Sequence, residues 1–70
     1  MDTRSQRVFL SVCSTLNFTR SAEALHLSVS AVSRTIQRLE EDLGRPLLER
    51  DRRSMRLTAA GRALRDHAQR

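Results

Sequence analysis

The part of the sequence best suited to contact a ligand is SVSAVSRTIQRLEEDLG, residues 28–44. Its apolar residues are spaced four, three and four positions apart, which indicates one face of a helix. These inward residues are Val32, Ile36, Leu39 and Leu43. The outward face carries hydroxyls, a guanidinium and an amide in its first half. Such groups are typical of a surface that reads base edges, since serine allows close approach, arginine binds guanine and glutamine binds adenine.

The predicted base-reading residues lie near the amino end of this helix, the end that helix-turn-helix proteins use for base contact. From the helical pattern they are Ser30, Ser33, Arg34 and Gln37. The acidic residues Glu40, Glu41 and Asp42 would be repelled by phosphates, so we expect the carboxyl half to tilt away from DNA. A solvated face without a ligand is the alternative. The short turn before the helix favours DNA recognition.

A second candidate element is an arginine-rich hairpin after Pro46. The pattern there changes from helical spacing to alternation, which predicts strands at Leu47–Arg50 and Met55–Leu57. The tip is then Asp51–Ser54. We expect the arginines of the tip to reach a minor groove and those of the base to contact phosphate. They are Arg52 and Arg53 at the tip, and Arg50 and Arg56 at the base. A solvated turn with surplus charge is the alternative.

The distribution of charge supports a polyanionic partner. The net charge of the 70 residues is +5. Residues 1–43 hold five arginines and five acidic residues, whereas residues 44–70 hold eight arginines and three acidic residues. The whole excess therefore lies in the carboxyl-terminal part. A local positive field of this kind suits nucleic acid first and a membrane surface second.

Capping residues predict three helices before the hairpin and one after it. Candidate amino-terminal caps are Asp2, Asn17, Ser28 and Thr58, and Gly44 followed by Pro46 ends the third helix. The first helix has an apolar face of Val8, Phe9, Val12, Cys13 and Leu16, and the second has Phe18, Ala22 and Leu25. A break of about three residues, HLS, separates the second helix from the third. The pattern predicts a mainly α fold, a winged helix-turn-helix of three helices and a short two-stranded wing.

The fourth helix, AAGRALRDHAQR, is predicted to begin a linker to further structure. Ala60, Leu64 and Ala68 are in register for a partner helix, so we expect them to mediate dimerisation. The helix shows no stop signal before Arg70. We therefore expect a DNA-binding domain over residues 1–57 and the start of a linker helix over residues 58–70, in an amino-terminal module of a longer protein.

Other function classes lack support in the sequence. Cys13 is the single cysteine, which excludes an internal disulfide framework and favours the reducing cytoplasm. Because Cys13 lies on the apolar face of a predicted helix, we expect its thiol to be unreactive. No apolar run approaches the roughly 20 residues that cross a bilayer, and no signal peptide is visible. His26 and His67 have no metal-ligating partner at a suitable spacing. We predict no catalytic residues, metal, cofactor or membrane partner.

Spaced motifs give the sequence a specific resemblance. F-T-x-x-A-x-x-L-H, S-x-S-x-x-I-x-x-L-E-x-x-L-G-x-P-L and a wing ending L-T-x-A-G occur together over residues 18–61. The chain resembles the amino-terminal DNA-binding domain of LysR-type transcriptional regulators over essentially its whole length. The resemblance implies that the third helix, residues 29–43, reads bases through Val29, Ser30, Ser33 and Arg34, and that Arg53 contacts the minor groove or phosphate. Thr19 and Arg38 complete the predicted backbone contacts.

The resemblance also implies partners for the whole protein. The first is promoter double-stranded DNA. The second is another copy of the chain, bound through the linker helix, and a tetramer is the larger assembly. The third is a small-molecule inducer, bound by a carboxyl-terminal domain that lies outside these residues.

Some residues depart from the family pattern. Val29 and Ser30 stand where a polar residue and proline are common, and Val29 could contact a thymine methyl group. Thr3 and Gln6 stand where leucine is usual.

Two other functions fit the sequence less well. A protein-interaction or dimerisation module of winged-helix type would leave the arginines of the hairpin unexplained. Non-specific binding to a polyanion, whether DNA, RNA or anionic lipid, is the second alternative. Binding that is insensitive to salt would favour the first, and equal binding to unrelated DNA the second.

Overall fold

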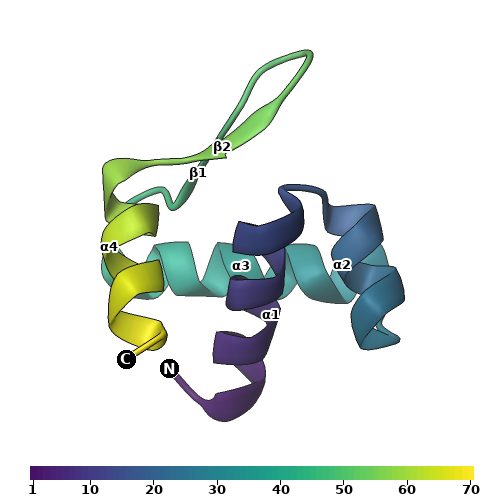
Figure 1. Ribbon diagram of the computed structural model, residues 1–70, viewed down its shortest axis with the longest axis horizontal. Helices are drawn as coiled ribbons and strands as arrows, with labels where there is room; N and C mark the ends of the chain where they lie inside the picture. Colours follow the sequence, from purple (N-terminus) through teal and green to yellow (C-terminus); the bar gives the residue numbers. More distant parts are fainter.

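A computed structural model describes residues 1–70 as four helices and one hairpin (Figure 1). The helices are α1 (Thr3–Thr15), α2 (Phe18–Leu25), α3 (Val29–Leu43) and α4 (Ala59–Ala68). The strands are β1 (Leu48–Arg50) and β2 (Met55–Leu57), paired antiparallel with Leu48 opposite Leu57 and Arg50 opposite Met55. The hairpin projects from the helical body, so the architecture is the winged helix predicted from the sequence.

Each helix begins at the predicted cap, whose side chain accepts a hydrogen bond from a backbone N–H three residues later. The acceptors are Asp2, Asn17, Ser28 and Thr58, and the donors are Ser5, Arg20, Ala31 and Gly61. The pairing with the Ser5 N–H lowers the pKa of the Asp2 carboxyl. Gly44, with φ 68°, ends α3 as predicted. These four caps are confirmed because they depend only on neighbouring residues.

One apolar core joins the three-helix body to the base of the wing. Val8, Phe9, Val12, Phe18, Ala22, Val32, Ile36, Leu39, Leu47, Leu48 and Leu57 form it. Phe9, Val12, Val32 and Leu47 have no exposed surface. The only buried polar side chain is Ser21, whose hydroxyl bonds to the hydroxyls of Ser11 and Thr15. The core therefore holds the outward face of α3 at a fixed angle to the wing.

Two of the residues predicted to face the core are exposed instead, so the prediction is wrong for them. Leu16 is 37% exposed and ends α1 with a left-handed φ of 51°, so it lies outside the helix whose apolar face it was expected to extend. Leu43 is 50% exposed although its position in α3 is in phase with Ile36. The cause is tertiary, because α4 packs chiefly against α1 and β2 and leaves the last turn of α3 uncovered.

The amino end of α4 is fixed to the segment that precedes the wing. Leu47 O accepts a hydrogen bond from the Thr58 N–H at 3.0 Å, and Pro46 O accepts from the Thr58 hydroxyl at 2.7 Å. At the other end of α4, Gln6 Nε2 donates to Ala68 O at 2.8 Å. Gln6 therefore connects α1 to the end of α4 by a hydrogen bond, and the two chain ends lie near each other (Figure 1).

The residues predicted for dimerisation have neighbours within this chain. Ala60 and Leu64 pack against the core of their own domain, and Ala68 is half-buried. A role in dimerisation stays a prediction for the part of these side chains that is still exposed. The predicted division at residue 57 also stays a prediction, since α4 packs on the body through α1 and β2.

Candidate nucleic-acid interface

The predicted reading face of α3 points away from the core. Val32, Ile36 and Leu39 are buried, whereas Ser30, Arg34, Gln37 and Arg38 are exposed. Val29 is 44% exposed and Ser33 is half-buried on the flank. The turn from His26 to Ser28 brings α3 directly after α2, and His26 ends α2 with a left-handed φ of 58°. The side chains predicted to read bases therefore share one accessible surface.

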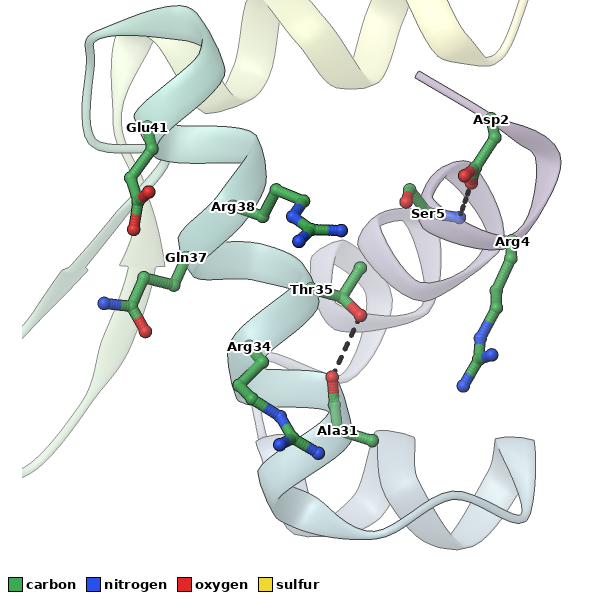
Figure 2. A pocket seen from close by; sticks show the side chains of 9 residues that line it. All are labelled: Asp2, Arg4, Ser5, Ala31, Arg34, Thr35, Gln37, Arg38 and Glu41. Atoms are coloured by element: carbon green, nitrogen blue, oxygen red, sulfur yellow. Dashed lines mark hydrogen bonds between the residues drawn. The ribbon is translucent and has the colours of Figure 1, made fainter.

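The two flanks of α3 face different elements. Arg38 extends toward Ser5 of α1, whereas Gln37 and Glu41 extend away from α1 (Figure 2). An open groove lies on the α1 side, and Ala31 is its only apolar lining residue. The Thr35 hydroxyl donates to Ala31 O at 2.9 Å. The opposite flank faces the base of the wing.

Glu40 corrects one prediction made for the acidic end of α3. It was grouped with Glu41 and Asp42 as an acid that phosphates would repel, but its carboxylate accepts hydrogen bonds from the Leu47 N–H at 2.7 Å and the Leu48 N–H at 3.4 Å. Because a carboxylate that accepts backbone N–H groups is held firmly, Glu40 connects the recognition helix to the first strand of the wing. Glu41 and Asp42 are exposed, and their predicted effect on tilt stays a prediction.

The tip of the wing is shaped by Asp51. Its Oδ1 accepts hydrogen bonds from the backbone N–H groups of Arg53 and Ser54, each at 2.8 Å. These bonds lower the pKa of the exposed Asp51 carboxyl. The Asp51 N–H donates to Ser54 O and closes the turn. Arg52 and Arg53 are exposed with no ion pair, so the tip presents two guanidinium groups that can reach DNA.

The arginines at the base of the wing have partners. The Arg50 guanidinium lies 4.7 Å from the ring centroid of Phe18, the first residue of α2. This cation–π contact orients Arg50 beside the amino end of α2. Arg56 Nε pairs with Glu49 Oε2 at 3.0 Å. Both members of that pair are well exposed, so its free energy is small, about 0–1 kcal/mol, and a phosphate can compete for Arg56.

A family model decides the class of protein. The model described as "Bacterial regulatory helix-turn-helix protein, lysR family" matches residues 3–62, which include all of α1, α2, α3 and the wing. The chain belongs to the LysR family.

Relatives of this LysR-family chain include named regulators. It is 54% identical over 69 residues to the HTH-type transcriptional activator IlvY of Salmonella typhimurium, covering 99% of this chain and 23% of IlvY. A solved LysR-family regulator from Eggerthella lenta covers all of both chains with a TM-score of 0.95 and 41% identity. The CbnR_DBD–DNA complex has a TM-score of 0.91 and 40% identity, covering 99% of this chain and 79% of that one. The chain spans about a quarter of the length of the curated relatives it matches.

Two residues of the LysR-family domain were missed by reasoning from the sequence. Glu40 was grouped with the other acids of α3, because nothing local distinguishes a residue whose partners lie seven and eight positions later. Arg4 lines the groove beside α3. It was not predicted as a site residue because the arginines and acidic residues of positions 1–43 are equal in number and indicate no basic surface. The signal for Arg4 was its place in the first turn of a helix that packs against α3. Thr19, predicted to contact phosphate, is exposed at the start of α2.

The remaining candidates for chemistry are isolated. Burial raises the pKa of the Cys13 thiol to about 11, which keeps it protonated and poorly nucleophilic at neutral pH. No three side chains of His, Cys, Asp or Glu are grouped as a metal site. None of the helices combines the length and the apolar character needed to cross a membrane.

Proposed function

We propose that this chain binds promoter double-stranded DNA sequence-specifically as the DNA-binding domain of a bacterial LysR-family transcriptional regulator. The observation that carries the proposal is the division of α3, whose apolar face is buried while its serine, arginine and glutamine side chains are exposed. Since the similar CbnR_DBD chain has been solved with DNA, this surface is the first candidate for base contact. In the proposal α3 enters the major groove, with Val29, Ser30, Ser33, Arg34 and Gln37 facing base edges.

The wing supplies a second contact in this proposal. Arg53 and Arg52 insert into or lie along the minor groove, while Arg50, Arg56, Arg38 and Thr19 contact the backbone. In the whole protein two such domains associate through the helix that begins at α4, with the exposed parts of Ala60, Leu64 and Ala68 at the contact. A tetramer is the larger assembly. A carboxyl-terminal domain outside these residues binds an inducer, and the protein acts in the cytoplasm without catalysing a reaction.

Selection from a random pool of duplexes tests the proposal. The domain is expected to enrich one sequence, with half-sites about one helical turn, roughly 34 Å, or a multiple of it apart if two domains bind together. Enrichment of no sequence despite salt-sensitive binding would favour non-specific polyanion binding. Failure to bind DNA, together with salt-insensitive protein association, would favour an interaction module.

Arg34→Ala is expected to weaken binding to the selected duplex by about 1–3 kcal/mol and to relax base preference at the position it contacts. The reason is loss of a bidentate contact to one base, which a scrambled duplex does not offer in the same register. Fluorescence anisotropy on matched and scrambled duplexes measures both effects. Equal weakening on the two duplexes would contradict a base-reading role.

Arg53→Ala is expected to weaken binding and to reduce the preference for A·T-rich flanks. A narrow A·T-rich minor groove concentrates negative potential, so the loss of the guanidinium should reduce affinity most for duplexes with A·T-rich flanks. Repeating the duplex selection with this variant reports the flanking composition directly. An unchanged flank preference would mean that the wing tip is not in the minor groove.

A further inference from the structure

The groove between α1 and α3 is lined by three arginines that form no ion pair (Figure 2). Its lining consists of Asp2, Arg4, Ser5, Ala31, Arg34, Thr35, Gln37, Arg38 and Glu41. The chain forms two ion pairs, Arg56 with Glu49 and Arg65 with Asp66, and neither involves this groove. Arg4 and Arg38, which come from different helices, are therefore exposed guanidinium groups without a carboxylate partner.

The two acids of the groove do not cancel these arginines. Asp2 is held as the cap of α1, with its Oδ1 2.7 Å from the Ser5 N–H, so its carboxylate is already bound to the helix end. Glu41 extends away from α1 in Figure 2 and lies on the far wall. In Figure 2 Arg38 is directed toward Ser5, while Arg4 extends along the α1 edge of the groove. Arg34, the third arginine of the lining, belongs to the predicted reading face of α3. Guanidinium and hydroxyl donors along one groove suit the oxygens of a DNA backbone.

The position of the groove indicates which phosphate. A helix in the major groove has one sugar-phosphate backbone on each side of it. Glu40, on the wing side of α3, bonds to the base of the wing, whereas Ala31, Thr35 and Arg38 line the α1 side. In the proposed complex the wing therefore contacts the DNA backbone on one flank of α3, and the groove lies beside the backbone on the other flank.

We propose that Arg4, Arg38 and Ser5 form a binding site for a DNA-backbone phosphate on the flank of α3 opposite the wing. The inference rests on the proposed function and adds α1 to the surface that contacts DNA. The domain then grips both backbones beside the major groove. Contacts of this kind fix the position of the reading helix without specifying sequence.

The test compares Arg4→Ala with Arg7→Ala. Arg7 is a matched control because it is an exposed arginine of the same helix with no ion pair, and it lies outside this groove. Affinity is measured by fluorescence anisotropy at several salt concentrations, with the duplex recovered by selection and with a scrambled duplex. Circular dichroism confirms that each variant is folded.

Arg4→Ala is expected to weaken binding roughly tenfold, equally on both duplexes. It should also reduce the slope of log K against log salt by about one. Arg7→Ala should change affinity less than about twofold and leave that slope unchanged. If Arg4→Ala and Arg7→Ala have the same small effect, the phosphate site is overturned while the proposed function stands. If the unmodified domain binds both duplexes equally, the base-reading proposal fails instead.

A neutral methylphosphonate placed at successive backbone positions locates the phosphate. At one position on the flank away from the wing, it should weaken binding of the unmodified domain but not weaken Arg4→Ala further, because one contact cannot be lost twice. Arg38→Ala should be non-additive with Arg4→Ala, and Arg53→Ala should be additive with it. Additivity of Arg4→Ala with the methylphosphonate at every position would overturn the site.

Discussion

Gly61→Ala is expected to lower the free energy of unfolding by about 2–4 kcal/mol. A Cβ at position 61 would lie 2.2 Å from Leu47 O and 3.2 Å from Leu57 Cδ2. The first distance is far inside any normal contact, and the obstacle is backbone rather than a flexible side chain. Helix α4 would have to move outward, which stretches the hydrogen bond from the Thr58 N–H to Leu47 O and uncovers Leu47.

The expected sign is opposite to that of local helix propensity. In an exposed helix interior, alanine stabilises by about 1 kcal/mol relative to glycine. At position 61 the clash outweighs this gain, and for a domain of this size the melting temperature should fall by roughly 10–25 °C. Thermal unfolding followed by circular dichroism measures it. A raised melting temperature would show that α4 does not sit this close to Leu47.

Gly44→Ala is the matched control, since Gly44 and Gly61 are the two glycines of the chain. A Cβ at position 44 meets nothing within 4 Å, but its φ of 68° disfavours an L side chain. The expected cost is about 1–2 kcal/mol and arises from backbone strain alone. Gly44→Asn should recover part of it, because asparagine tolerates the left-handed region. No such rescue is expected at position 61, where the obstacle is steric.

The features predicted correctly from the sequence are those set by nearby residues. The caps at Asn17 and Ser28 each need only a backbone N–H three positions later, and the wing follows from a change of period after Pro46. Leu16 and Leu43 were predicted wrongly, since helical phase says which way a residue points and not whether another element covers it.

The reading face of α3 was predicted in the same way and is exposed as expected, because its core residues fix the opposite direction. The parts of the site that sequence reasoning did not find depend on contacts between elements. Arg4 becomes a candidate only once α1 lies beside α3. Arg50 was predicted as a site residue, but its contact with Phe18, 32 positions earlier in the chain, was not. Such contacts have no local period or cap to reveal them.

Glu40→Ala is expected to destabilise the domain by about 2–4 kcal/mol and to loosen the wing relative to α3. Its carboxylate accepts from the N–H groups of Leu47 and Leu48, and both residues are buried, so the alanine variant leaves two buried donors without an acceptor. Urea unfolding measures the stability. Glu41→Ala is the control, because it removes the same charge from an exposed neighbour with no hydrogen bond and should change stability by less than about 0.5 kcal/mol.

The effect of Glu40→Ala on DNA binding separates a positioning role from a purely structural one. If Glu40 holds the wing in register with the reading helix, Arg53→Ala should cost less affinity in the Glu40→Ala background than alone, since the wing is already misplaced. Glu40→Gln keeps an acceptor oxygen but loses the charge. Its stability and its coupling to Arg53→Ala should therefore lie between those of the unmodified domain and those of Glu40→Ala. Full additivity of Glu40→Ala and Arg53→Ala, measured on folded protein below the unfolding transition, would mean that the wing finds its place without Glu40.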